Sequence, residues 1–313
     1  MNKSENILNL SVIIPIFDAT DSIKLLVSFF LSQRFKPKEI ILLDSGSNIH
    51  ITKYFETLSK SSEIVIYKKI NFSHPGTARN IGINISKSDY LTFFDINTLP
   101  RVNWLKKSFD IVKKDNLSVL FGKRITLDNS FIKKIIKYST YGNSSYVSLT
   151  GTIILKSFLI NNNFFFINTR AGEDIEWIKR VKAKTNHINT EIILYNGLSN
   201  NIIFNLKKWF IYSMSYSKVL KDVNHQKKIY FFAMIYSLLA IFFLENYYLF
   251  LFFSLNFLIY LIYFAFVRPV YSKVNFKDLF PFNWILIFFI RILFDISKTP
   301  GLLIGYIRTL FKI

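Results

Sequence analysis

Cysteine is absent from the 313 residues of the chain. Its absence excludes disulfide bonds, a thiolate metal site and a cysteine nucleophile, and it suits a reducing cytoplasm. Acidic residues are also scarce, with 20 Asp and Glu against 40 Lys and Arg, so the formal net charge is +20. This excess predicts an anionic partner, for which a nucleic acid, an anionic lipid and a phosphorylated substrate all qualify.

Residues 1–17 also show little that is typical of a signal peptide. Residues 1–17 hold one short β-branched apolar run and no small-residue cleavage site, so we expect the amino-terminal domain to stay in the cytoplasm. Phe, by contrast, is abundant at 34 residues, many of them after residue 229. A nucleic-acid surface would interleave basic and aromatic residues on one soluble face. The distribution therefore favours a membrane segment and predicts no nucleic-acid partner.

Strand-like and helical stretches alternate up to about residue 200. Apolar runs with little alternation, typical of strands buried on both faces of a parallel sheet, cover 11–17, 39–44, 63–67, 90–95 and 118–122. Helices are predicted over 21–33, 51–60, 76–86 and 102–114. This order predicts a doubly wound α/β domain over 1–200 with right-handed crossovers.

The pattern changes after residue 200. Residues 201–228 mix aromatic residues with lysines, which indicates a basic amphipathic helix at a membrane surface; a solvated linker helix is the alternative. Two runs nearly free of charge then form 229–267, separated by Glu245 and Asn246. The second run is long enough to span a bilayer. Because basic residues flank the pair, we predict a transmembrane hairpin with both ends cytoplasmic.

A third apolar segment lies within residues 268–313. It carries Arg291, Asp295 and Lys298, with Pro300 and Gly301 past its middle. A charge at the centre of a bilayer is costly, so two interfacial helices fit this segment better than one span.

Two carboxylates end apolar strands. Asp95 closes the run 90–95, and an acid at the carboxyl end of a buried strand faces the crevice where open α/β sheets bind ligands. Asp44 closes the run 39–44 before a glycine-containing turn, where it can bind a base or a ribose hydroxyl. An Asx turn that satisfies its own backbone is the alternative for Asp44.

Three further groups lie after strands or at helix starts. Pro15 forces the chain out of the ladder near the end of its strand, so Phe17 and Asp18 overhang the same crevice, where a base or ribose could stack or bond; an edge strand with a turn aspartate is the alternative. Arg79, one turn into the helix that Gly76 opens, can face a diphosphate or be a solvated helix-start residue. His74, just before it, fits a turn or packing residue better than a base.

Glu173 and Asp174 open the last helix of the domain. They can complement the helix dipole and cap its first turn, or one of them can be a general base. Arg180 can pair with a phosphate or with an acid of the same helix. Gly151 and Thr152 are expected near the acceptor by position alone.

The motifs SVIIPIF, LLDSGS, FSHPGTARNIG, YLTFFDIN and GEDIEW follow one another along the chain. In order and spacing the chain resembles, over about residues 10–185, the family 2 inverting glycosyltransferases. The resemblance implies a GT-A nucleotide-diphospho-sugar transferase domain, with a Rossmann-like, mostly parallel sheet, followed by a C-terminal helical membrane region. In detail the motifs look most like bacterial enzymes that build O-antigen or capsular polysaccharide, including rhamnosyltransferase-like members.

The resemblance also implies roles for single residues. On the donor side, Pro15 and Phe17 border the nucleobase pocket, Asp44 contacts base or ribose, Arg79 lies near the nucleotide, and Asp95 is the first acid of an Asp-x-Asp motif. On the acceptor side, Asp174 is the catalytic base with Glu173 in support, and Trp177 and Arg180 shape the site.

Asn97 departs from the family pattern, because it stands where the second acid of the motif is expected. Its carbonyl can bind Mg²⁺ or Mn²⁺ but supplies no charge. A divalent cation held by Asp95 and Asn97 is still expected, with Arg79 and the basic surface sharing the diphosphate charge.

Together these features predict an inverting glycosyltransferase on the cytoplasmic face of the cell inner membrane. Its expected partners are a nucleotide-diphospho-sugar donor, a lipid-linked or growing glycan acceptor, and membrane lipids. Two alternatives remain open: a polyprenyl-phosphate sugar synthase, and a catalytically inactive membrane scaffold with the same fold.

Overall fold

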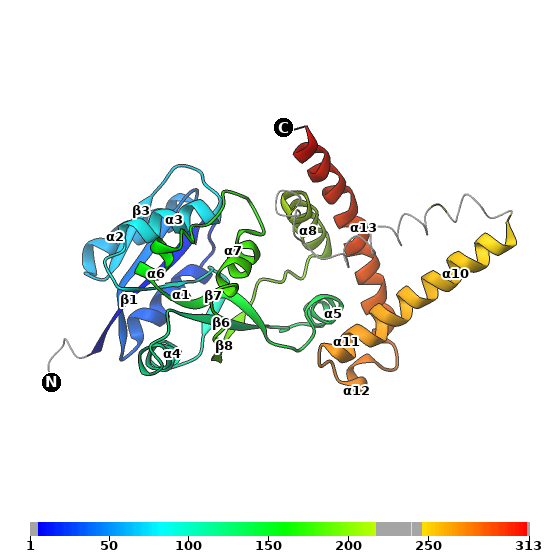
Figure 1. Ribbon diagram of the computed structural model, residues 1–313, viewed down its shortest axis with the longest axis horizontal. Helices are drawn as coiled ribbons and strands as arrows, with labels where there is room; N and C mark the ends of the chain where they lie inside the picture. Colours follow the sequence, from blue (N-terminus) through cyan, green and yellow to red (C-terminus); the bar gives the residue numbers. More distant parts are fainter. Residues whose placement is uncertain (1–5, 217–238, 240–245, 312–313) are drawn as a thin grey trace. The chain divides into compact units, whose positions relative to one another are not determined.

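The computed structural model describes residues 6–216, 239 and 246–311. It divides into two compact units (Figure 1). The first comprises Met1–Thr126 and Ser145–Gly197, and the second comprises Leu127–Ser144 and Leu198–Ile313. The segment Leu127–Ser144, which the sequence analysis leaves inside a domain ending at residue 200, thus belongs with the carboxyl-terminal residues.

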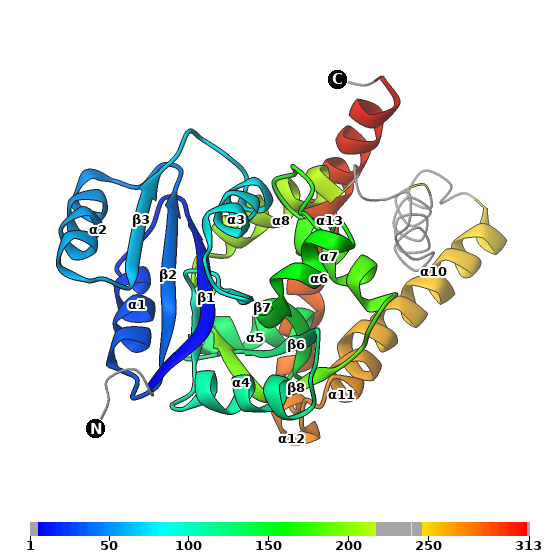
Figure 2. The same ribbon diagram turned by 60° about the vertical axis from the view of Figure 1, so that its left-hand side comes forward.

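An eight-stranded sheet forms the centre of the first unit (Figure 2). In spatial order the strands are β3 (Val65–Lys69), β2 (Lys36–Asp44), β1 (Ile7–Ile16), β4 (Tyr90–Phe93), β7 (Tyr146–Leu155), β6 (Val119–Thr126), β8 (Ile188–Tyr195) and β5 (Thr98–Pro100). The first four run parallel to one another, as predicted. Beyond β4 the sheet is mixed, because β7 is antiparallel to both neighbours and β5 is antiparallel to β8.

Helices cover both faces of this sheet, which confirms the predicted α/β domain. One face packs against α1 (Ser22–Ser32), α2 (Ile49–Ser61) and α4 (Trp104–Lys114). The other packs against α3 (Pro75–Ile85), α6 (Lys156–Asn161) and α7 (Glu173–Lys182). In β1, Val12 and Ile14 point to the first face and Ile13 to the second, and all three are fully buried. The near-continuous apolar runs therefore reflect burial on both sides.

Three strands of the mixed half were not predicted: β5, β7 and β8. In β7, Ser148, Thr150 and Thr152 alternate with other small or apolar residues, so no apolar run marks the strand. Their hydroxyls are nevertheless buried in the sheet, where Thr152 accepts a hydrogen bond from the Gly122 amide and donates one to the Ser148 carbonyl. Partners elsewhere in the sheet, rather than local pattern, stabilise this strand.

Helices make up the described part of the second unit. They are α5 (Phe131–Thr140), α8 (Ile202–Tyr216), α10 (Tyr247–Ile262), the π-helical turn η3 (Tyr263–Val267), α11 (Arg268–Tyr271), α12 (Phe276–Leu279) and α13 (Asn283–Leu310). Ile135 and Tyr138 of α5 pack with Leu279 and Ile287. The Tyr138 hydroxyl and the Lys134 ammonium also bond the Asp278 carboxylate, at 3.1 and 2.8 Å. These contacts explain why the segment around α5 belongs to this unit.

Helix α13 is a single helix of 28 residues, so the prediction of two interfacial helices is wrong. Its charges do not interrupt it because they are paired: Asp295 accepts from Arg291 at 2.8 Å, from Tyr260 at 2.8 Å and from Lys298 at 3.5 Å. Helix α8 packs along α13 (Figure 1). A Cβ atom on Gly301 would lie 2.4 Å from the Phe210 carbonyl oxygen, so only glycine allows this approach.

Among the described residues, one helical segment, Tyr247–Tyr271, is long and apolar enough to cross a membrane, with a mean hydropathy of 2.2. It includes the predicted second run of the hairpin. The first run, 229–244, lies outside the described residues except for Leu239, as does the 217–228 part of the predicted amphipathic segment. Length and composition alone support a membrane role for Tyr247–Tyr271.

Candidate active site

A buried arginine joins two of the predicted site acids. Arg79 of α3 donates from Nη2 to Asp95, just after β4, at 2.8 Å, and from Nη1 to Glu173, the first residue of α7, at 2.9 Å. Its guanidinium also lies 5.5 Å from the centroid of the Phe166 ring. Both terminal nitrogens are therefore engaged by carboxylates. Arg79 is therefore not a solvated helix-start residue, and a contact between Arg79 and a diphosphate stays a prediction.

Asp95 faces residues from the mixed half of the sheet. Its second carboxylate oxygen accepts a hydrogen bond from Thr150 of β7 at 2.8 Å and lies 3.7 Å from Nη1 of Arg124 of β6. Desolvation acts to raise the pKa of Asp95, but Arg79, Arg124 and the Thr150 hydroxyl outweigh it and lower that pKa below its usual value. Asp95 is thus ionised, and its side chain remains 36% exposed to a ligand.

The two acids that open α7 differ in environment. Glu173 is buried, and desolvation raises its pKa to about 7 although Arg79 opposes the shift. Asp174 is half-buried, and its carboxylate accepts a hydrogen bond from the Ile175 amide of its own helix. Glu173 therefore anchors α7 to Arg79, whereas Asp174 presents a carboxylate that a substrate can reach.

Asn97 and Asp95 lie on one short connection between β4 and β5. The backbone carbonyl of Asn97 accepts a hydrogen bond from the backbone amide of Asn196 at 2.8 Å, which ties this connection to the end of β8. Within the described ranges, no group of three or more His, Asp or Glu side chains could hold a metal ion by itself. One carboxylate and one amide oxygen fit Mg²⁺ or Mn²⁺ when phosphate oxygens and waters complete the shell.

Asp44 adopts the Asx turn that the sequence left as an alternative. One carboxylate oxygen accepts from the amides of Gly46 and Ser47 at 3.0 and 2.9 Å, and the other accepts from the Tyr67 hydroxyl at 2.6 Å. Burial and the bond to Asp44 raise the pKa of Tyr67 well above its usual value. This network holds the turn after β2 in place, and a nucleotide contact by Asp44 stays a prediction.

Aromatic rings gather beside this turn. Phe17 is 50% exposed and meets Phe72 edge-on, with ring centroids 5.5 Å apart; Phe72 meets His74 in the same way at 5.8 Å. Pro15 lies in register with Leu43, inside the strand pair β1–β2. Because β1 has β2 on one side and β4 on the other, the edge-strand alternative is wrong. The exposed rings form a surface on which a nucleobase could stack.

Two residues predicted on the acceptor side have structural roles instead. Trp177 is fully buried, stacks on Phe166 at 5.2 Å and donates its indole N–H to the Phe164 carbonyl. Arg180 makes a bidentate pair with Glu176 on the same helix and also bonds the Phe165 carbonyl. The alternative of an acid on the same helix is therefore the one found.

Glycines and hydroxyls expected near ligands also serve packing. A Cβ atom on Gly76 would lie 2.5 Å from the Ile167 carbonyl oxygen, so its close approach is to the chain and not to an anion. Gly151 adopts a φ of +76° inside β7, where a Cβ atom would lie 2.1 Å from Ile193. The Thr152 hydroxyl forms its hydrogen bonds with the Gly122 amide and the Ser148 carbonyl, both within the sheet. Thr150, two residues earlier, is the one that reaches Asp95.

Arg124 and Thr150 were missed by the sequence analysis. A signal for Arg124 was available, because Lys123 and Arg124 follow the apolar run 118–122 just as Asp95 follows 90–94. In an α/β sheet a polar residue at the carboxyl end of such a run faces the ligand crevice. Thr150 carries no comparable signal.

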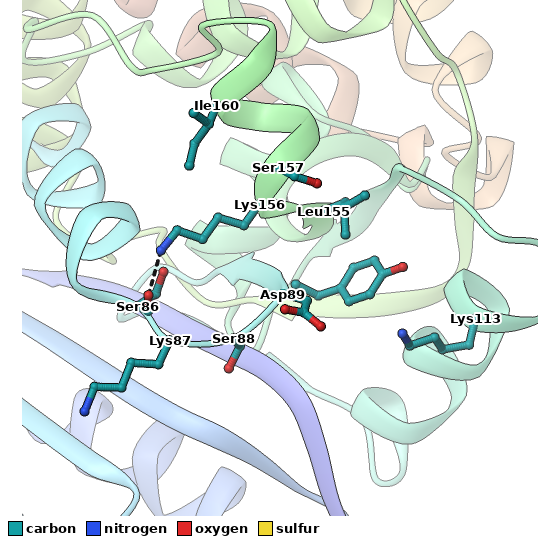
Figure 3. Close-up of a pocket in the computed structure, with 10 residues that line it drawn as sticks. Ser86, Lys87, Ser88, Asp89, Lys113, Leu155, Lys156, Ser157 and Ile160 are labelled. Carbon is teal, nitrogen blue, oxygen red and sulfur yellow. Dashed lines mark hydrogen bonds between the residues drawn. The ribbon is translucent and has the colours of Figure 1, made fainter.

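A hollow of about 460 Å³ lies elsewhere in the first unit (Figure 3). It is lined at the start of β4 and around α6, and Lys156 crosses it to donate to the Ser86 carbonyl at 2.6 Å. Lys113 lies over the Tyr90 ring at 4.5 Å. Tyr90 begins β4 whereas Asp95 follows its end, so this hollow is distinct from the site around Arg79.

Residues 11–180 match the pattern of Glycosyl transferase family 2. The chain belongs to this family. All the charged site residues described above lie within the matched range, and the aromatic surface and the Asx turn lie there too. The family match thus covers the whole of the candidate site.

Relatives and a solved structure extend this result. The glycosyltransferase GlyG of Streptococcus pneumoniae is 22% identical over 62% of this chain and 72% of its own length. A chondroitin synthase of Pasteurella multocida is 24% identical over an aligned region that covers 39% of this chain and 13% of that enzyme. The structure of Staphylococcus aureus TarS 1–349 in complex with UDP-GlcNAc has a TM-score of 0.50 at 13% identity, covering 97% of this chain and 92% of that one. The TarS likeness supports the fold alone.

Proposed function

We propose that the chain is a membrane-associated, inverting glycosyltransferase. It moves a sugar from a nucleoside-diphospho-sugar to a lipid-linked or growing polysaccharide acceptor. Family membership supports the reaction class, and polysaccharide synthesis is supported by the chondroitin synthase among the relatives. The UDP-GlcNAc complex of TarS, a protein of similar fold, supports a nucleotide-sugar donor.

The observation that carries the proposal is the contrast between Glu173 and Asp174. Asp174 removes the proton of the acceptor hydroxyl as the new glycosidic bond forms at the anomeric carbon and the bond to the diphosphate breaks. Inversion follows because the acceptor attacks opposite the leaving diphosphate. Glu173, paired with Arg79, sets the position of α7 and hence of Asp174.

The donor lies, in this proposal, along the parallel half of the sheet. Its base stacks on Phe17 beside the Asp44 turn, which Pro15 helps to shape, and its ribose and diphosphate reach Asp95. A divalent cation, when bound, neutralises the departing diphosphate. Asp95 and Asn97 would hold it.

Membrane association is proposed from Tyr247–Tyr271, an apolar helical segment with few buried residues. It would hold the catalytic unit at the cytoplasmic face of the inner membrane, close to a lipid-linked acceptor. The excess of positive charge over the whole chain supports attraction to anionic lipids.

A donor screen tests the proposal. The full chain, purified in detergent, is heated with UDP-, GDP- and dTDP-sugars, each with and without Mn²⁺. We expect one nucleotide class to raise the melting temperature, more strongly with Mn²⁺, and donor hydrolysis to accompany it. No shift and no hydrolysis with any donor would leave the inactive scaffold as the better account.

The product distinguishes the two acceptor classes. Sugar recovered in a glycosidic bond to a glycan supports the proposed reaction. Sugar recovered on polyprenyl monophosphate would instead identify a polyprenyl-phosphate sugar synthase.

A further inference from the structure

Arg124 is the residue of the site whose role the proposed function leaves open. It lies near the carboxyl end of β6, and its guanidinium carbon is 5.0 Å from the ring centroid of Tyr146 and 4.6 Å from that of Tyr195. Its side chain is 17% exposed, so two aromatic rings and the sheet enclose most of the guanidinium.

The hydrogen-bonding capacity of Arg124 is not fully used. Its Nε atom is buried and has no hydrogen-bond partner, but the same holds for the Nε atom of Arg79, so the two arginines differ at their terminal nitrogens. Its Nη1 atom is 3.7 Å from Asp95, close enough for electrostatic attraction but too far for a hydrogen bond. Aromatic faces stabilise a cation without accepting its N–H donors in the ring plane. No carboxylate thus holds the terminal nitrogens of Arg124 at hydrogen-bond distance, which leaves them able to donate to an anionic ligand.

Arg79 provides the internal comparison. Its two terminal nitrogens both donate to carboxylates, which cancel its charge and use those donors. Among carboxylates, Arg124 has only the longer contact to Asp95, and it also hydrogen-bonds the Tyr146 side chain. Although desolvation lowers it, the pKa of Arg124 is raised by Tyr146, Tyr195, Asp95 and Asp174, so the group is permanently charged. A planar guanidinium whose terminal nitrogens form no hydrogen bond with a carboxylate matches a phosphate group, which accepts two parallel N–H bonds.

The position of Arg124 places that phosphate at the reacting centre. Asp95 lies at the end of the donor half of the sheet, and Asp174 is near enough to act electrostatically on the same guanidinium. Strand β6 belongs to the other half, beyond β7. Arg124 therefore lies where the donor and the acceptor meet.

We propose that Arg124 binds a phosphate group of a substrate through its guanidinium, with Tyr146 and Tyr195 holding the group in place. The proposal rests on the proposed function. Two sources share this chemistry: the diphosphate of the donor, and a phosphate carried by the acceptor.

Calorimetry on the full chain in detergent separates the sources. Arg124→Gln is compared with wild type and with Lys123→Gln, a neighbour on β6 that removes the same charge. In the first arm, UDP, GDP and dTDP are titrated; in the second, inorganic phosphate is titrated into protein saturated with the diphosphate that binds best. Loss of affinity by about tenfold or more in Arg124→Gln alone is expected in one arm. The first arm identifies the donor diphosphate, and the second identifies a separate phosphate position.

Unchanged affinity in both arms for Arg124→Gln, or equal losses in Lys123→Gln, overturns the proposal while leaving the proposed function intact. Wild-type protein that binds none of the three diphosphates rejects the proposed function itself. Tyr195→Leu guards against misfolding of Arg124→Gln. Tyr195→Leu retains the charge of Arg124 and removes one of the two rings, so we expect a several-fold loss of affinity in the same arm. Unchanged affinity in Tyr195→Leu would overturn the supporting role of the rings.

Discussion

The two halves of the central sheet present their charged residues in different states. In the parallel half, Asp44 has partners for both oxygens within its own turn and from Tyr67. At the mixed half, Arg124 keeps an unpaired Nε, and the Asp174 carboxylate of α7, which packs on β7, bonds an amide of its own helix. The Asp44 carboxylate is satisfied inside the protein, whereas Arg124 and Asp174 are the groups that we propose a substrate would complete. Arg79 and Asp95 join the two halves.

Replacing the Asp174 carboxylate is expected to have the largest effect, and this effect is on the rate of sugar transfer. Asp174→Asn keeps the shape of the side chain but cannot take a proton, so transfer should fall by about 10²–10⁴-fold. Donor affinity should stay within about twofold, since the parallel half is untouched. Steady-state transfer and calorimetry measure the two quantities. Glu176→Gln, which removes an acid two residues further along α7, is the control. Near wild-type turnover by Asp174→Asn would exclude Asp174 as the base.

Breaking the link between the halves is expected to cost stability. Arg79→Met leaves Glu173 buried without its partner, and loss of one member of a buried pair costs about 3–5 kcal/mol. Hydrogen exchange of peptides from the first unit measures the change locally. Arg180→Met, whose pair with Glu176 is more exposed, should cost only about 1 kcal/mol. Equal effects of the two substitutions would contradict a special role for the Arg79 bridge.

The pH dependence of the free energy of unfolding should report the raised pKa of the buried Glu173. Its pKa of about 7 in the folded chain lies above the 4.5 of an unperturbed glutamate, so the folded chain binds more protons than the unfolded chain between these pH values. This contribution is complete below pH 4.5 and is lost as pH rises through 7, with a limiting slope of about 1.4 kcal/mol per pH unit. Glu173→Gln should flatten that part of the profile. A profile unchanged by the substitution would contradict the raised pKa.

The smallest effect on the free energy of unfolding is expected at the Asp44 carboxylate, in the parallel half of the sheet. Tyr67→Phe removes one hydrogen bond from Asp44, which keeps its two backbone partners, so about 1 kcal/mol should be lost. Exchange rates of the β2 and β3 amides report it. Tyr54→Phe, at a partly exposed position on α2, should change little. A loss as large as that of Arg79→Met would show that the Asp44 turn is not independently satisfied.

The parallel half and its motifs could be predicted because their signals are local. An apolar run, a carboxylate at its end and a glycine turn lie within ten residues, and burial on both faces leaves a near-continuous hydrophobic pattern. The positions of Asp44, Asp95 and the pair Glu173–Asp174 at strand ends or a helix start follow from that pattern alone.

Partners could not be predicted in the same way. Nothing in the sequence distinguishes Trp177 as a core residue from Trp177 as an acceptor contact, and stacking on Phe166 decides between them. Likewise, Arg180 could face a phosphate or Glu176, and only the fold of the 164–166 segment selects the latter. Strand β7 lacks an apolar run because its polar side chains bond inside the sheet.

By itself, the sequence determined the α/β order, the family and the carboxylates that follow the apolar strands of the parallel half, because these depend on neighbours along the chain. The tertiary structure decided which charges meet: Arg79 and Glu173 are 94 residues apart, and Thr150 and Asp95 are 55 apart. Such pairs form only when separate strands and helices pack side by side. Their packing also decides which groups are used up inside the protein and which, like Asp174 and Arg124, are left for a substrate.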